Sequence, residues 1–110
     1  MRTTVVFAGF ILLAAGMGAQ AAGNAAAGRA KAAEVCVACH GSDGNRPSAP
    51  DQPVLAGQHY DYLVRALKDY KSGKRSNAIM KGFAASLTTK EIEDLAAWFS
   101  SQKSLLHDQR

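Results

Sequence analysis

The decisive stretch of this 110-residue chain is Cys36-Val37-Ala38-Cys39-His40. Its two thiols are three positions apart, about one helical turn, and a histidine follows the second thiol directly. This spacing is typical of a c-type haem attachment site. Each thiol can form a thioether with one haem vinyl group, and the imidazole then lies within reach of the iron. We therefore predict one covalent haem c, attached through Cys36 and Cys39 and ligated by His40.

Three other interpretations of the cysteine pair stay open. A thioredoxin-like redox pair needs a βαβ context, and the sequence has no strand pattern. A structural zinc site needs four ligands, so His59 or His107 would have to join Cys36, Cys39 and His40, at a spacing that matches no common zinc pattern. A disulfide between the two cysteines would close a tiny loop and restrain little of the unfolded chain. Haem attachment is the interpretation that best explains the motif.

The first residues are typical of a secretory signal. Arg2 supplies a positive start, residues 5–15 are apolar, and Ala19-Gln20-Ala21 has the small-x-small form of a cleavage site. We expect a cleaved signal peptide over 1–21 and a haem-carrying domain over 22–110, exported to the periplasm. An uncleaved membrane anchor is the alternative, although the strongly apolar part is shorter than a roughly 20-residue span.

The rest of the chain predicts an all-α domain with three main helices and two long loops. No stretch alternates β-branched and polar residues as a strand would. Helical signals mark segments from about 24 to 35, 59 to 71 and 89 to 102. The intervening segments 41–57 and 72–87 carry prolines or glycines. We expect both to be loops that wrap the cofactor.

Local signals support the first and third helices. Asn24 is the expected N-cap of the first, and Thr88 with Glu91 matches a capping box before the third. Gly28 lies inside the first helix, where glycine costs about 1 kcal/mol relative to alanine. Its presence predicts close packing against another backbone or a bulky ring.

Met80 is the expected second axial ligand. Met1 and Met17 lie in the predicted signal, so Met80 is the sole methionine of the expected mature chain. It falls in the predicted loop between the second and third helices. A thioether opposite histidine favours Fe(II) and raises the reduction potential. His59, at the start of the second helix, is the alternative sixth ligand.

Several segments together resemble the class I c-type cytochromes, specifically the small bacterial group related to the halves of diheme cytochromes. The likeness covers nearly all of the expected mature chain. One departure is Phe83, because relatives often have a second methionine at this position, three residues after the ligand. The segments that carry the likeness are Gly28, Cys36-Val37-Ala38-Cys39-His40-Gly41, Pro53-Val54-Leu55-Ala56-Gly57-Gln58, Met80 and Asp94-Leu95-Ala96-Ala97-Trp98-Phe99.

The resemblance implies a class I cytochrome c fold around one covalent haem, in which the first and last helices cross near Gly28 and Trp98. It also implies that the Pro53 carbonyl accepts a hydrogen bond from the far ring nitrogen of His40. Such a contact would fix the ring orientation and raise the basicity of the ligand. The residues implied to pack near the porphyrin are Leu55 and Leu67.

These observations predict an electron carrier rather than an enzyme, since a six-coordinate iron has no open site for substrate. Two alternatives stay open. One is a cytochrome subunit permanently bound to a dehydrogenase or oxidase. The other is a ligand-binding or peroxidase-like haem protein, which would need an open or readily displaced sixth position. Arg46, Tyr60 and Arg65 are candidate partners of the haem propionates, without a basis for choosing among them.

The formal net charge is +4 at pH 7, which favours an acidic redox protein or an anionic membrane surface as partner. No run of Arg and Lys is interleaved with aromatic residues, so nucleic acid is not expected. Haem-attachment machinery is the expected partner during maturation. Five cations near the second helix and Met80 either steer an acidic partner or form an ordinary solvated face: Lys68, Lys71, Lys74, Arg75 and Lys81.

Overall fold

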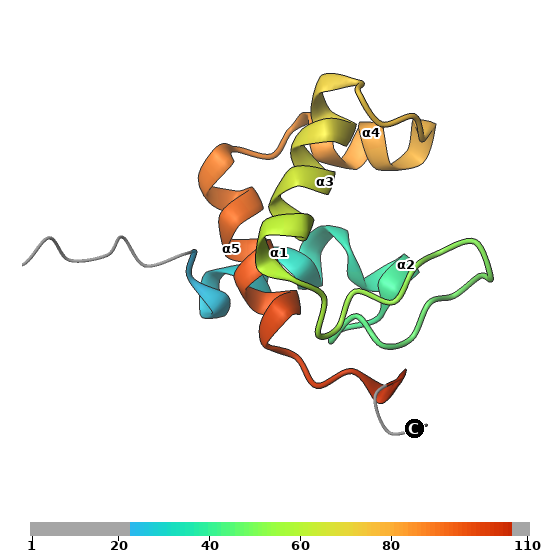
Figure 1. Ribbon diagram of the computed structural model, residues 1–110, viewed down its shortest axis with the longest axis vertical. Coiled ribbons are helices and arrows are strands. Elements are labelled where there is room, and N and C mark those ends of the chain that lie inside the picture. Colours follow the sequence, from blue (N-terminus) through green and yellow to red (C-terminus); the bar gives the residue numbers. More distant parts are fainter. Residues whose placement is uncertain (1–22, 107–110) are drawn as a thin grey trace, which may run out of the picture.

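The computed structural model describes residues 23–106, and these form five α-helices and no strand (Figure 1). The all-α fold class is therefore confirmed. No helix in this range is long and apolar enough to cross a membrane. The predicted signal peptide and His107 lie outside the described residues. The helices are α1 (Ala25–Val35), α2 (Val37–His40), α3 (Tyr60–Ser72), α4 (Ala78–Ala85) and α5 (Thr89–Ser101).

The three predicted main helices are present as α1, α3 and α5, with ends within about one residue of those expected. The Asn24 side chain accepts a hydrogen bond from the Ala27 N–H at 3.0 Å and so caps α1. Thr88 and Glu91 form the capping box of α5, with both of its hydrogen bonds present. The local signals in the sequence thus placed these helix ends correctly.

The expectation of a loop over residues 72–87 was wrong, because α4 lies inside this segment. Gly73, with φ +84°, ends α3, and Asn77 then starts a new helix by accepting a hydrogen bond from the Met80 N–H at 3.0 Å. Gly82 made this segment a weak helix candidate in the sequence, since glycine is a poor helix former. Asn77 was the N-cap signal that could have revealed the helix. Met80 therefore lies in the first turn of a helix.

Close packing of α1 and α5 at Gly28 is confirmed. A Cβ atom at this position would collide with the carbonyl oxygen of Asp94 and lie 2.9 Å from the Cβ of Trp98. The backbone and Cβ of α5 occupy the space that the glycine leaves. The Arg29 guanidinium is 5.6 Å from the centre of the Trp98 ring.

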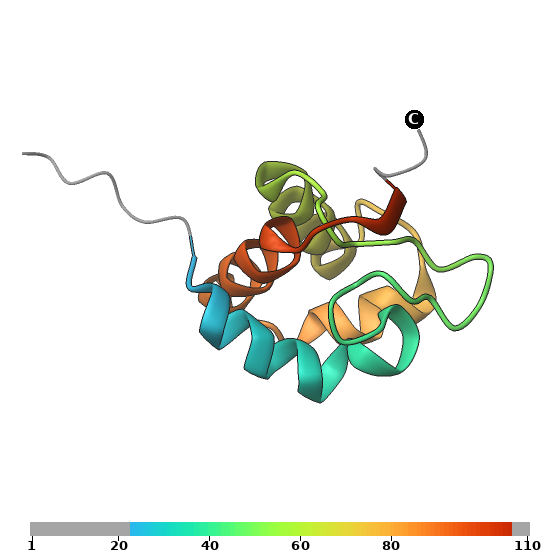
Figure 2. The ribbon, with the colours of Figure 1, turned by 90° about the horizontal axis from the view of Figure 1, so that it is seen from below.

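The hydrophobic core is built mainly by α5, to which α1, α3 and α4 each add one residue. Both ribbon views show α1 and α5 together at one end of the domain (Figures 1 and 2). Both views place α2, α4 and the loop over residues 41–57 toward the other end. The buried core residues are Ala32, Leu63, Ala84, Leu87, Ile92, Leu95, Ala96 and Phe99.

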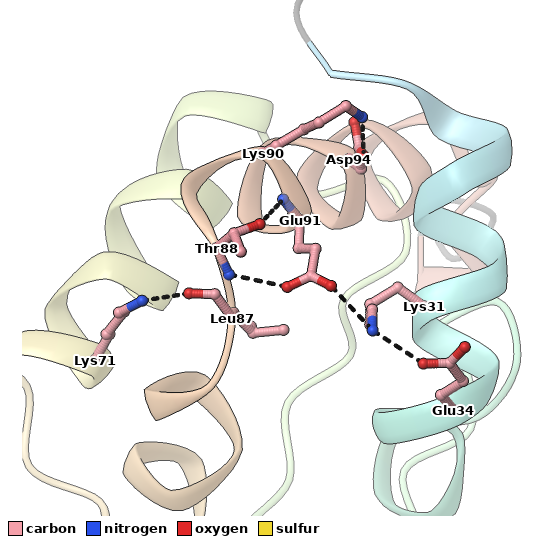
Figure 3. Close-up of polar contacts among 8 residues, drawn as sticks. All are labelled: Lys31, Glu34, Lys71, Leu87, Thr88, Lys90, Glu91 and Asp94. Carbon is pink, nitrogen blue, oxygen red and sulfur yellow. Dashed lines mark hydrogen bonds and ion pairs between the residues drawn. The ribbon is translucent and has the colours of Figure 1, made fainter.

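Polar contacts fasten the start of α5 to its neighbours (Figure 3). The Glu91 carboxylate accepts the Thr88 N–H at 2.9 Å and pairs with Lys31 of α1 at 3.0 Å. The Lys71 ammonium of α3 donates a hydrogen bond to the Leu87 carbonyl, just before the same capping box. One end of α5 is thus connected to both α1 and α3.

Candidate haem site

Cys36 marks the bend between α1 and α2. Its N–H donates to the Ala32 carbonyl at 2.9 Å, and its own carbonyl accepts the His40 N–H at 3.0 Å. The chain therefore stays hydrogen-bonded through the bend, and Cys39 and His40 follow on the single turn of α2. Gly41, with φ +82°, ends this turn. The two thiols and the imidazole are presented from a helical segment.

Both cysteines are half-buried free thiols, and Cys36 packs against the core. Burial, with a smaller contribution from the Cys39 thiol, raises the pKa of Cys36 to about 11. This free thiol is protonated at neutral pH and is therefore a weak nucleophile. Within residues 23–106, no group of three or more His, Cys, Asp or Glu side chains is arranged to hold a metal ion.

His40 is buried, with 6% of its surface exposed, and its Nδ1 lies 3.0 Å from the carbonyl oxygen of Pro53. A carbonyl can only accept, so Nδ1 carries the proton and donates. The lone pair of Nε2 is then left for a metal. Metal-ligating histidines usually hold their other ring N–H in this way.

The loop over residues 41–57 places the Pro53 carbonyl through a short pairing within itself. The Leu55 and Ala56 N–H groups donate to the Gly44 carbonyl at 2.8 and 3.3 Å. Gly44 has φ +80°, and a Cβ there would lie 2.8 Å from the Phe99 ring. A larger residue would push the loop away from α5. Glycine is therefore required both for the positive φ and for the close approach to Phe99.

The residues just after His40 are also tied to the rest of the site. The Trp98 indole N–H donates to the Ser42 carbonyl at 3.2 Å, and the Ser48 N–H donates to the Cys39 carbonyl at 3.0 Å. The Arg46 N–H donates to the His40 carbonyl at 3.3 Å. The hydrogen bond of Trp98 could not be predicted from the sequence, because it joins residues 56 positions apart. Trp98 thus connects α5 to the histidine segment as well as to α1.

Met80 is half-buried and lies one turn before Ala84, which is fully buried in the core. The thioether therefore belongs to the inner side of α4, which packs against α3. In both ribbon views, α2 and α4 lie on the same side of α3 (Figures 1 and 2). His40 and Met80 thus come from two separate elements on one side of the domain.

The remaining candidates are placed differently. Leu55 and Leu67 are half-buried and pack against the edge of the core. His59 is exposed at the start of α3, where its side chain makes no capping hydrogen bond. It lines a hollow of about 330 Å³ together with Ser104 and Leu106 of the C-terminal segment. Its surroundings differ from those of the buried His40.

The residues present fit a covalently bound haem. They include two unpaired thiols, an imidazole with a free ring nitrogen and a half-buried thioether. Large apolar side chains also stay exposed, with Val37 at 41%, Ile79 at 66% and Phe83 at 45%. Ile79 and Phe83 line a hollow of about 340 Å³ on α4.

Comparison with known proteins supports this fit. The family model for cytochrome c matches residues 25–103. The chain belongs to the cytochrome c family. Over 85 residues it is 54% identical to cytochrome c4 of Pseudomonas aeruginosa, covering 77% of this chain and 41% of that protein. The resemblance to class I c-type cytochromes is therefore confirmed.

Two further relatives agree. The chain is 45% identical over 85 residues to cytochrome c-554(548) of Halomonas halodenitrificans, covering 74% of this chain and 100% of that protein. The crystal structure of reduced recombinant cytochrome c4 from Pseudomonas stutzeri matches with a TM-score of 0.69 and 46% identity. That match covers 76% of this chain and 47% of the solved chain. The chain spans less than half the length of these cytochrome c4 proteins.

Membership of this family and the attachment motif together establish the cofactor. This cytochrome c domain carries one covalent haem c, as the sequence predicts from Cys36, Cys39 and His40. The structural neighbours also share the class I cytochrome c fold that the resemblance implied. The axial role of Met80 stays a prediction.

Proposed function

We propose that this chain is a one-electron carrier and not an enzyme, with His40 and Met80 as the two axial ligands of its haem. The observation that carries the proposal is the 3.0 Å contact between His40 Nδ1 and the Pro53 carbonyl. This contact leaves Nε2 as the ring nitrogen that faces a metal. The bound haem supplies the Fe(III)/Fe(II) couple.

The residues of the chain would keep the site nearly unchanged between the two oxidation states. The Pro53 carbonyl holds the proton on Nδ1 and fixes the plane of the His40 ring. The Met80 thioether favours Fe(II) and raises the reduction potential. Leu55 and Leu67 would exclude water from the haem and lower the local dielectric constant. With both His40 and Met80 bound to the iron, no site would be left at which a substrate could react.

The optical spectrum of the reduced, purified protein, with and without carbon monoxide, tests this proposal. We expect a c-type spectrum that carbon monoxide does not change. In Met80→Ala carbon monoxide should bind, whereas His59→Ala should behave like the wild type. A wild-type spectrum that shifts with carbon monoxide would favour ligand binding or catalysis. The absence of covalent haem would overturn the assignment of Cys36 and Cys39.

Export to the periplasm is part of the proposal. The signal features of residues 1–21 support it, as does the attachment motif, because this cofactor is joined to the chain outside the cytoplasm. Cell fractionation of a tagged full-length chain tests the compartment, and haem-containing protein in the cytoplasmic fraction would contradict it.

The proposed partner is an acidic redox protein that docks on the exposed side of α4. Two of the five cations considered in the sequence are engaged within the domain. Lys71 donates to the Leu87 carbonyl, and Arg75 donates to the Tyr62 hydroxyl at 3.1 Å. Lys68, Lys74 and Lys81 are exposed. Because Lys74 and Lys81 flank the apolar Ile79 in the sequence, they are the better candidates for steering.

Small redox reagents of opposite charge test this surface without a known partner. Charge reversal of both Lys74 and Lys81 should slow oxidation by ferricyanide, an anion, about two- to ten-fold at low salt. The same variant should react faster with hexaammineruthenium, a cation, and both effects should vanish at high salt. Equal rates for wild type and variant would mean that these lysines form an ordinary solvated face.

A further inference from the structure

The segment that follows α5 lies across the loop that carries Pro53. We call residues 102–106 the C-terminal strap. The Gly57 N–H at one end of the loop donates to the Phe99 carbonyl at 2.9 Å. A Cβ on Gly57 would lie 3.1 Å from the Cβ of Ser104, which is only 7% exposed. The end of α5 and the strap therefore hold one end of this loop.

Asn45 holds the other end. Its side-chain nitrogen donates to the Lys103 carbonyl, and its side-chain oxygen accepts the Leu105 N–H, both at 3.0 Å. One amide thus binds two backbone groups of the strap, two residues apart. These contacts join parts of the chain that are 58 and 60 positions apart. Asn45 therefore connects the loop to the strap, in addition to its local hydrogen bonds within the loop.

Asp43 fixes which way the Asn45 amide points. Its carboxylate accepts both the Asn45 backbone N–H and the Asn45 side-chain N–H, each at 3.0 Å. Both side-chain protons of Asn45 are then used, one on Asp43 and one on Lys103. A flipped amide would place its oxygen against two acceptors. The amide orientation that binds the strap is thus the only one in which Asp43, Asn45 and the strap backbone all keep their hydrogen bonds.

Asn45 is connected to His40 through the loop. The carbonyl of the preceding residue, Gly44, accepts the Leu55 N–H at 2.8 Å, and this pairing places Pro53. Pro53 in turn accepts the His40 Nδ1–H. We propose that Asn45 is a positioning residue: it fastens the C-terminal strap to this loop and thereby keeps the Pro53 carbonyl on the His40 ring. The proposal rests on the proposed role of His40 as an iron ligand.

Hydrogen exchange of the His40 Nδ1–H, measured by NMR in the reduced haem protein, tests this role. In Asn45→Ala the exchange should be about ten-fold faster, the change expected when one or two hydrogen bonds to the loop are lost. The reduction potential should rise, because a weaker hydrogen bond at Nδ1 makes the ligand less electron-rich and stabilises Fe(III) less.

Asn24→Ala is the matched control. The Asn24 side chain also accepts a backbone N–H, but it caps α1 and makes no hydrogen bond with the strap. This variant should lower the melting temperature while the His40 exchange stays within about two-fold of the wild type. Leu105→Pro is a second test, since it removes the strap N–H that donates to Asn45. It should speed His40 exchange without any change in the loop sequence.

Each outcome decides between two explanations. If Asn45→Ala and Leu105→Pro lower stability but leave the exchange and the potential as in the control, the strap is only structural and the proposal is wrong. A wild-type protein in which no Nδ1–H of His40 carries the strong shift of a haem-bound imidazole would instead overturn the proposed ligation. That second result would be recognised before any variant is made.

Discussion

The two ends of this domain are held together in different ways. At the crossing of α1 and α5, a Cβ on Gly28 would collide with the Asp94 backbone, so the two helices touch directly. On α4, a Cβ on Gly82 would meet nothing within 4 Å. Ile79 and Phe83 also stay largely exposed there. One end is closed by protein contacts, and the other presents unused apolar surface.

This difference indicates which contacts the chain makes alone and which it leaves to its cofactor. Small domains bury little core, and those below about 70–80 residues often add a metal, a disulfide or another link to be stable. Here α4 packs against α3, while α2 packs against α1. The haem, attached to α2 and ligated by α4 if Met80 is the ligand, would join these two pairs.

The largest effect should come from removing the haem. Replacing both Cys36 and Cys39 by serine prevents attachment, and amide protection in α4 and the second half of α3 should then disappear. Any protection that persists should be found in α1 and α5, which hydrogen exchange measures helix by helix. Val37→Ser is the control, because it changes an exposed residue between the two thiols and should retain haem. Uniform loss of protection would show that the two ends are not independent.

A smaller but still large effect should follow from Gly28→Ala. The added methyl group collides with the Asp94 carbonyl, so the helices must separate, at a cost of about 2–4 kcal/mol in the free energy of unfolding. Gly82→Ala makes the same chemical change inside α4 and meets no neighbour. It should stabilise the protein by about 0.5–1 kcal/mol through helix propensity. Denaturant unfolding would measure the change in the free energy of unfolding for both variants. Equal changes would contradict the difference between the two ends of the domain.

The fold could be predicted from the sequence where the deciding signals are local. The caps Asn24 and Thr88 and the attachment motif lie next to the structures that they determine. The α4 helix was missed because Gly73 and Gly82 made the segment resemble a loop, although Asn77 marked its start. Glycine alone does not distinguish a turn from a poor helix position, since the surrounding packing decides.

In the candidate site, too, only features with local signals could be predicted from the sequence. The covalent haem followed from five consecutive residues, and the Pro53 contact with His40 followed from resemblance. The hydrogen bonds of Trp98 with Ser42 and of Asn45 with the strap did not, because they depend on how distant helices approach each other. The side-chain amide of Asn45 resembled any polar loop residue in the sequence. Such contacts become visible only after the backbone has been placed.

The smallest effect concerns acid stability at the tightly packed end, where Asp94 is buried. Hydrogen bonds from Lys90 at 2.6 Å and from the Asn24 N–H at 2.7 Å lower the pKa of Asp94 in the folded protein (Figure 3 shows the Lys90 pair). A lowered folded pKa means that this stabilisation is present above the ordinary value, 3.8, and is lost as the pH falls below it.

Asp94→Asn should therefore lower stability by about 1 kcal/mol at neutral pH, and the difference from the wild type should shrink as the pH drops below about 4. Lys90 is exposed, so Lys90→Ala should cost only a few tenths of a kcal/mol. Most of the Asp94 effect should then belong to its bond with Asn24, which joins α5 to the cap of α1. Urea unfolding of the haem protein between pH 3 and 7 would measure this. A difference that persists unchanged at pH 3 would mean that Asp94 acts through packing, and that its charge does not hold the α1–α5 end together.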